Sequence, residues 1–199
     1  MAAVTASSAS TVRAWLYDGD DSVDQRAEHR GADVPLSALD ALGVLQFKLD
    51  PSAADYDPAK DAALQAIRAA RGYTYSDLIT LSPEKLPNYE AKLVTFFTEH
   101  LHTDEEIRYC LEGGGYFDCR NASDRWVRVS VQPGDMIILP AGMYHRFTLD
   151  AKNYGKFMRL FVGEPVWTPY NRNASETDLM AARDAYVKAF LAPLRSAAA

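Results

Sequence analysis

The chain has 199 residues, of which 48% are hydrophobic, and its formal net charge is −6. This length and apolar content predict one folded domain with a substantial core and exclude a largely disordered chain. A negative net charge disfavours nucleic-acid binding, which needs a basic face against phosphates, and disfavours docking on an anionic membrane. The sequence has no apolar run long enough to span a bilayer, so no membrane insertion is expected.

The N-terminus predicts a flexible tail. Residues 1–11 are mostly small and polar, and they lack the basic start and continuous apolar stretch of a secretory signal. We therefore expect a folded domain over 12–199 in a cytoplasmic protein. Cys110 and Cys119 are expected to be reduced, buried thiols in neighbouring strands.

The N-terminal half predicts short strands and helices in alternation. The predicted elements are a strand over 12–17, a charged loop over 18–30 with a solvated His29, a short helix capped by Ser37 and ending at Ala41, a strand over 44–49, and a helix over 59–71 that stops at Gly72. The segment 73–91 contains two prolines and predicts turns and loops. Residues 89–98 fit either a helix or a strand.

The C-terminal half changes character at His100. Short apolar stretches follow one another between turn residues, over 105–112, 116–120, 126–131, 136–139, 145–149 and 157–162. This spacing predicts an antiparallel sandwich or barrel. Ser175 and Asp178 form a capping arrangement for a C-terminal helix, whose apolar stripe would pack on the barrel: Leu179, Met180, Tyr186, Val187, Phe190, Leu191 and Leu194. The predicted class is α+β, mainly β, with a β-barrel centre and peripheral helices.

Three of the chain's four histidines belong to one pattern that favours metal binding. His100, His102 and Glu106 have equal parity, so in one extended strand they would all face inward, and His145 begins a later strand. Three imidazoles and a carboxylate suit iron, nickel, manganese, cobalt or zinc, whereas calcium and magnesium prefer oxygen ligands. On an octahedral metal these ligands would leave two positions open for water or substrate.

An ordinary structural role is the alternative for each of these residues. A histidine pair two apart is a weak signal, and Glu106 could be a solvated edge charge like Asp104 and Glu105. The second motif raises the specificity: Gly134, five residues, Pro140-Ala141-Gly142, two residues, His145. Its glycines, like Gly113 after the first motif, indicate positive-φ turns that redirect strands. Arg108 has the parity of Glu106, so it could share the inner face.

Together the two motifs resemble the signature motifs of the cupin superfamily. The segments 99–109, 139–149, 158–162 and 165–172 are further similar to the acireductone dioxygenase family, over about Trp15 to Arg172. The resemblance implies a cupin jelly-roll barrel with one Fe2+ or Ni2+ per chain, held by His100, His102, Glu106 and His145. It also implies that Arg108 is catalytic and that the pocket is formed by Phe96, Phe147, Arg159 and Trp167.

The function implied by the resemblance is a step of methionine salvage. The substrates would be the acireductone 1,2-dihydroxy-3-keto-5-methylthiopentene and O2. The iron form would yield 4-methylthio-2-oxobutanoate and formate, and the nickel form 3-methylthiopropanoate, formate and carbon monoxide. Family members also suggest protein partners and, besides the cytoplasm, a nuclear location.

Two alternatives stay open at this point. The chain could be another cupin enzyme, such as a flavonol-cleaving dioxygenase or a sugar-phosphate isomerase, although those lack the long matching segments. It could also be a non-enzymatic cupin that acts as a binding or regulatory protein. Such a protein would tolerate the loss of a ligand, whereas all four ligand residues are present here.

Overall fold

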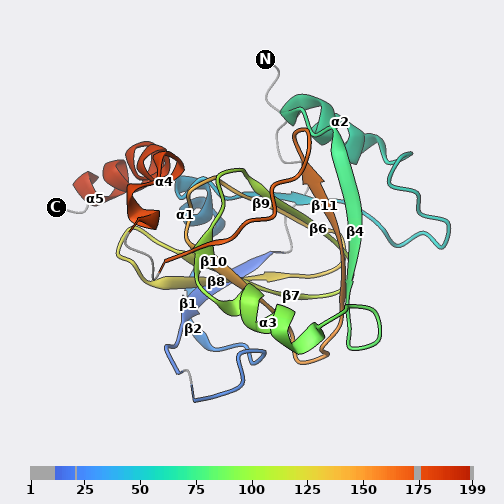
Figure 1. The fold of residues 1–199 in the computed structure, drawn as a ribbon, viewed down its shortest axis with the longest axis horizontal. Helices are drawn as coiled ribbons and strands as arrows, with labels where there is room; N and C mark the ends of the chain where they lie inside the picture. The colour runs from blue at the N-terminus through green and yellow to red at the C-terminus, as the bar shows by residue number, and fades with distance from the viewer. Residues whose placement is uncertain (1–11, 21, 173–175, 198–199) are drawn as a thin grey trace.

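The protein is built on two antiparallel β-sheets, with helices at the periphery (Figure 1). The computed structural model describes residues 12–20, 22–172 and 176–197. The predicted tail over 1–11 and the predicted cap Ser175 lie outside the described residues. The domain boundaries therefore stay a prediction.

Within the described part of the chain, the larger sheet has seven strands in the order β12-β5-β10-β7-β8-β1-β2, and the smaller sheet has five in the order β3-β9-β6-β11-β4. The larger sheet comprises β1 (Arg13–Tyr17), β2 (Arg30–Val34), β5 (His100–Leu101), β7 (Gly115–Arg120), β8 (Trp126–Val131), β10 (His145–Leu149) and β12 (Tyr170–Asn171). The smaller sheet comprises β3 (Leu45–Lys48), β4 (Tyr75–Leu81), β6 (Glu106–Gly113), β9 (Asp135–Leu139) and β11 (Gly155–Phe161). The six strands predicted after His100 are present, and the mainly β class is confirmed.

The core draws buried side chains from both sheets. Val129 and Phe117 of the larger sheet share one apolar cluster with Ile137 and Leu139 of the smaller sheet. Cys110 and Cys119 are buried free thiols in this cluster, as predicted. A second cluster joins the smaller sheet to the helix α2 (Ala62–Arg71). The smaller sheet is therefore covered by apolar contacts on both faces, which removes its side chains from water.

The remaining helices lie at the rim of the barrel. They are α1 (Leu36–Ala41), α3 (Tyr89–Phe97), the 3-10 turn Thr177–Leu179, α4 (Ala181–Tyr186), the π-helical segment Val187–Leu191 and α5 (Ala192–Ala197). The stop of α2 at Gly72, with φ +74, is confirmed, while the helix begins after its cap Asp61. The predicted cap Ser37 is wrong, because α1 already includes it and begins after Pro35 without a side-chain cap. No helix of the described residues has the length and apolar character needed to cross a membrane.

The ambiguous segment 89–98 forms the helix α3. Tyr89 and Leu93, four residues apart, are both buried, whereas Val94 is 69% exposed. The Thr95 hydroxyl donates to the Ala91 carbonyl at 3.0 Å, a bond that only a helical turn allows. Packing of one helical face against the core therefore outweighs the β-propensity of the run from Val94 to Phe97.

The prediction of turns over 73–91 is wrong, because β4 occupies part of that segment. β4 pairs with β11 along its whole length, from Tyr75↔Phe161 to Leu81↔Gly155. The strand is hard to predict from the sequence because Asp77, a charged residue, takes an inward-facing position where an apolar residue is expected. In the structure, Arg159 neutralises it through hydrogen bonds of 2.7 and 2.6 Å.

Two further expectations need correction. His29 is 4% exposed and not solvated: its ring stacks on Tyr17 at 4.4 Å, and its Nδ1 lies 2.9 Å from Asp18 Oδ1. In the C-terminal stripe, Tyr186 and Leu191 are buried as predicted, but Leu179 is 83% exposed. Leu179 lies in the 3-10 turn before Met180, where the backbone becomes extended, so it does not continue the helical face of α4.

Candidate metal centre

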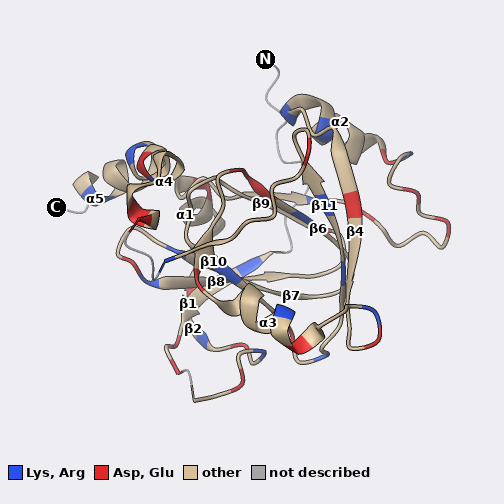
Figure 2. Cartoon of the chain, viewed as in Figure 1, with Lys and Arg blue, Asp and Glu red and all other residues tan. Residues whose placement is uncertain are grey.

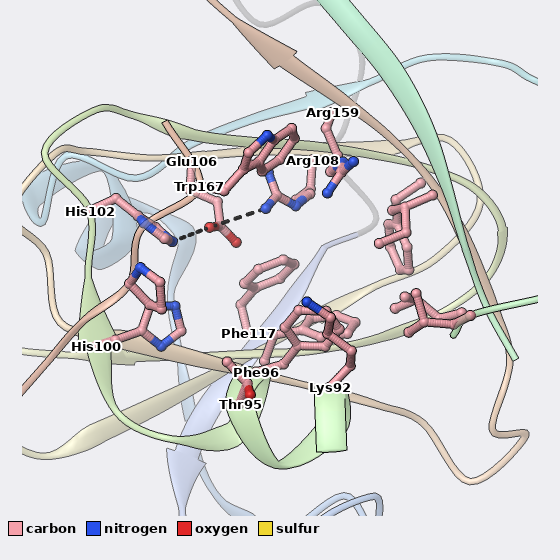
Figure 3. Close-up of a pocket in the computed structure, with 16 residues that line it drawn as sticks. Lys92, Thr95, Phe96, His100, His102, Glu106, Arg108, Phe117, Arg159 and Trp167 are labelled. Atoms are coloured by element: carbon pink, nitrogen blue, oxygen red, sulfur yellow. Dashed lines mark ion pairs between the residues drawn. The ribbon is translucent and has the colours of Figure 1, made fainter. Parts of the chain in front are cut away.

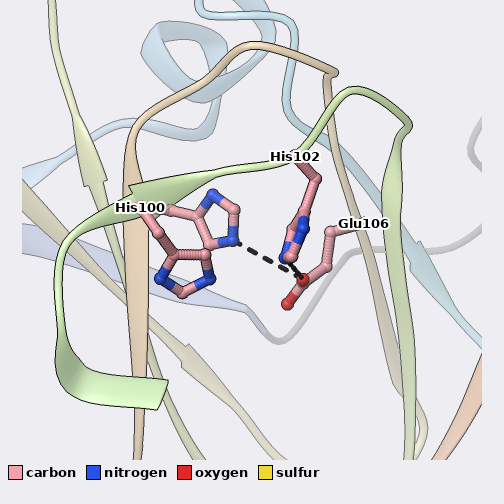
Figure 4. Close-up of side chains that lie close together, drawn as sticks. His100, His102 and Glu106 are labelled. Carbon is pink, nitrogen blue, oxygen red and sulfur yellow. Dashed lines mark ion pairs between the residues drawn. The ribbon is translucent and has the colours of Figure 1, made fainter. Parts of the chain in front are cut away.

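The side chains of the candidate ligands lie close together (Figure 4). His100 on β5 is paired with His145 on the adjacent antiparallel strand β10 of the larger sheet. Glu106 begins β6 of the smaller sheet, and His102 lies in the turn between β5 and β6. The prediction that His100, His102 and Glu106 share one strand is therefore wrong. The chain crosses from one sheet to the other between them, and this crossing turns their side chains toward His145.

The donor atoms are close enough to bind a common ion. One ligand atom from each of His100, His102, Glu106 and His145 lies within 4.8 Å of all the others. Glu106 Oε2 is 3.0 Å from His102 Nε2 and 3.5 Å from His145 Nε2. Ligands about 2.1 Å from a first-row metal lie about 3 to 4 Å apart, so the spacing fits such an ion.

Backbone carbonyls orient all three imidazoles. Nδ1 of His100, His102 and His145 lies 2.6, 2.9 and 2.9 Å from the carbonyl oxygens of Thr98, Thr168 and Met143. A carbonyl only accepts hydrogen bonds, so each Nδ1 carries a proton, and Nε2 is the ring nitrogen left to bind a metal. His145 Nε2 is buried without a hydrogen-bond partner, as expected of an atom reserved for a metal.

The surroundings of His100 and Glu106 favour the protonation states in which these two side chains can bind a metal. Burial, together with the neighbouring His145, lowers the pKa of His100 to about 3, so its ring is neutral at physiological pH. Burial alone would raise the pKa of Glu106, but Arg108 and the surrounding histidines hold it well below its usual range. Glu106 is therefore a carboxylate. A neutral imidazole beside a carboxylate suits a borderline divalent cation.

Arg108 lies beside the centre on β6. Its Nη2 is 3.2 Å from Glu106 Oε2, and its Nη1 donates to the Ile107 carbonyl at 3.0 Å. Across the sheet Arg108 faces Arg159 on β11, which in turn faces Asp77 on β4. Asp77 neutralises Arg159, whose guanidinium also stacks 3.8 Å over the ring of Trp167. Arg108 is thus the arginine whose charge faces the candidate metal centre.

A cavity of about 380 Å³ opens onto the centre (Figure 3). His100, His102, Glu106 and Arg108 contribute its polar wall. The apolar wall comes from Ile79, Leu81, Leu86, Phe96, Phe117, Phe147 and Phe157. All four residues predicted around a pocket, Phe96, Phe147, Arg159 and Trp167, line this cavity.

Sequence reasoning missed several lining residues. Ile79 and Leu81 lie on the unpredicted strand β4, and Lys92 and Thr95 lie on α3. In the sequence, the spacing of Lys92, Thr95 and Phe96 would place all three on one face of a helix. Without a decision between helix and strand, that face could not be identified.

The turn that carries His102 and Glu106 is tethered from outside the centre. Glu105, expected to be solvated, accepts a hydrogen bond from the Tyr73 hydroxyl at 2.6 Å and forms an ion pair with Arg71. Arg71 Nε also donates to the Tyr73 hydroxyl at 2.6 Å. These contacts attach the turn to the end of α2, so they restrict the position of two candidate ligands.

Loosening this tether is expected to weaken metal retention. In Glu105→Gln the ion pair with Arg71 is lost, and we expect the metal affinity to fall by up to about tenfold, the lower end of the range for outer-shell contacts. Competition with a chelator measures the affinity. Lys156→Met is the matched control. It removes a 2.8 Å ion pair between Lys156 and Glu112, and neither of these residues belongs to the centre. Equal affinities in the two variants would contradict a positioning role for Glu105.

The sequence model of the ARD/ARD' family matches residues 13–169. The chain belongs to this acireductone dioxygenase family. An acireductone dioxygenase 2 of Oryza sativa subsp. indica is 57% identical over 180 residues, which cover 89% of this chain and 87% of the relative.

A solved structure has the same fold. The acireductone dioxygenase from Bacillus anthracis, with a cadmium ion in its active centre, superposes with a TM-score of 0.63 at 26% identity. The match covers 81% of this chain and 99% of that protein, and it confirms the predicted cupin barrel.

High identity in this family does not by itself imply activity. A protein of Sorghum bicolor named "Probable inactive acireductone dioxygenase 2" is 56% identical over 172 residues, which cover 85% of this chain and 91% of the relative. The case for activity therefore depends on the residues that this chain has at its own centre.

Proposed function

We propose that the chain is a metal-dependent acireductone dioxygenase that cleaves 1,2-dihydroxy-3-keto-5-methylthiopentene with O2. The observation that carries the proposal is the intact donor set: three imidazoles held by backbone carbonyls, with their Nε2 atoms converging beside the Glu106 carboxylate. Membership of the family supplies the reaction, and the donor set is the reason to assign it to this member.

The donor set fits one Fe2+ or Ni2+ per chain, bound by His100, His102, Glu106 and His145. Imidazole and carboxylate suit both ions, and neither charge nor ligand type selects between them. When bound, such a metal would supply a Lewis acid and a template for the two neighbouring oxygens of the substrate.

The chain's own residues would bind and orient the substrate. Arg108, partly buried beside Glu106, would donate hydrogen bonds to a substrate oxygen and stabilise negative charge that develops on it. Phe96 and Phe147, whose rings meet edge to face at 6.4 Å, would pack against the methylthio tail. The apolar wall would also exclude water, which strengthens the electrostatic contacts of Arg108.

The bound metal is expected to determine the products. Apo-protein reloaded with Fe2+ should yield 4-methylthio-2-oxobutanoate and formate, whereas the same batch reloaded with Ni2+ should yield 3-methylthiopropanoate, formate and carbon monoxide. The expected reason is that a bound Fe2+ would supply redox chemistry toward O2, whereas a bound Ni2+ would supply mainly Lewis acidity. Product analysis on one divided batch measures the difference.

Two results would count against these assignments. Identical products from both metals would exclude control of the products by the metal. The absence of O2 uptake with either metal would refute the acireductone assignment itself.

The wider role is part of the same proposal. We place the reaction in methionine salvage, because its substrate carries the methylthio group of that pathway. A location in the cytoplasm and nucleus, and a protein partner, are expected from the family resemblance. Imaging of the tagged protein and its co-purification from cells test these two expectations.

A further inference from the structure

Among the residues that the structure describes, the cavity has one positively charged wall residue without a counter-charge, Lys92 on α3. We propose that Lys92 is a specificity residue that captures the anionic form of the substrate at the cavity, an inference that rests on the proposed function.

The helix α3 presents Lys92 to the cavity by its periodicity. Tyr89 and Leu93 pack into the core, while Lys92, Thr95 and Phe96 line the cavity at i, i+3 and i+4. Lys92 is the basic residue of α3, visible as its blue segment in Figure 2. In Figure 3 its side chain projects from the helix toward the space in front of the candidate metal centre.

The other cavity charges are already paired. Arg108 lies 3.2 Å from Glu106, and Arg159 forms an ion pair of 2.6 Å with Asp77. Within the described ranges, no carboxylate oxygen lies within 4.0 Å of the Lys92 ammonium, and no side-chain hydrogen bond holds it. Lys92 therefore adds an uncompensated positive charge to the cavity.

The reactants have the charge that such a group attracts. The enediol of an acireductone is acidic, so the form that binds a metal is an anion, and the keto acid and formate products are carboxylates. A cation beside a cleft raises the rate at which anions enter it. Because Lys92 is exposed, water and salt screen its field, and we expect an effect of about three- to tenfold on kcat/KM.

The test compares three variants of the metal-loaded enzyme. Lys92→Met removes the charge and keeps much of the side-chain volume, Lys92→Arg keeps the charge, and Lys152→Met removes an exposed charge that does not line the cavity. Steady-state kinetics at about 0.01 M and about 1 M ionic strength exploit the fall in screening length from about 30 Å to about 3 Å. Calorimetric binding of 4-methylthio-2-oxobutanoate provides a readout that needs no turnover.

Lys92→Met should lose about three- to tenfold in kcat/KM at low salt through KM, with kcat little changed. It should also bind the keto acid more weakly and show a smaller salt dependence than wild type, while Lys92→Arg and Lys152→Met should behave as wild type. Wild-type kcat/KM and keto-acid affinity in Lys92→Met would overturn the inference, as would a loss confined to kcat. An inactive wild type would refute the proposed function instead, and keto-acid binding would still test Lys92.

Discussion

Replacing His102 by alanine is expected to remove the metal and abolish turnover. Metal content should fall from about one ion per chain to a small fraction, and kcat/KM should fall by about three orders of magnitude or more, because the substrate would lose the metal that is proposed to bind it. The His102 side chain is only partly buried, so its truncation should leave the fold intact. Elemental analysis of the purified protein and O2 uptake with acireductone measure the two effects.

His29 provides the matched control, as the chain's fourth histidine and one outside the centre. His29→Ala should lose stability, because the ring is buried and interacts with Asp18 and with the Asp24 carbonyl, but it should keep its metal. Full metal content and activity in His102→Ala would refute the assignment of the centre.

Replacing Arg108 by alanine is expected to impair catalysis while leaving metal content unchanged. The loss of one charge-stabilising donor should lower transition-state stabilisation by about 2 to 4 kcal/mol, or about 30- to 1000-fold in kcat/KM. Arg108→Lys should recover only part of the loss, since an ammonium lacks the forked donor geometry of a guanidinium. Steady-state kinetics with parallel metal analysis measure the effect.

Arg159→Met is the control for Arg108→Ala. It tests whether the loss of another arginine of the cavity lowers kcat/KM to the same extent. Because Asp77 already neutralises Arg159, its loss should affect catalysis less and stability more, through the unpaired Asp77. Kinetics of Arg108→Ala close to those of wild type would assign Arg108 a structural ion pair with Glu106 and no catalytic role.

Local sequence patterns are sufficient to predict the strands and turns of the C-terminal half. Strands from β6 to β11 follow from short apolar stretches between turn residues. The framing glycines predicted at positive-φ turns are confirmed, with φ values of +69 at Gly113, +92 at Gly134 and +79 at Gly142. Each of these properties is decided by a residue and its near neighbours, because turn geometry and strand alternation act over a few residues.

The structure brings His100, His102 and Glu106 together, but not on the single strand that their equal parity predicted. β5 ends at Leu101, and β6 begins at Glu106 in the other sheet. The family resemblance named the same residues without depending on a strand. His145 and Glu106 lie on different sheets, so the distance between them depends on how the two sheets pack. The alternation of side chains along one strand cannot predict that distance.

Other features of the protein depend on residues that lie far apart in the sequence. Asp77 can face inward on β4 because Arg159, far along the chain, pairs with it. The helical state of α3, and with it the place of Lys92 and Thr95 in the cavity, depends on the packing of Tyr89 and Leu93 against the barrel. His29 is buried because Tyr17 and Asp18 lie beside it. Propensity differences of less than about 1 kcal/mol per residue are small beside such burial and pairing energies, so these choices are made by contacts that a single stretch of sequence does not contain.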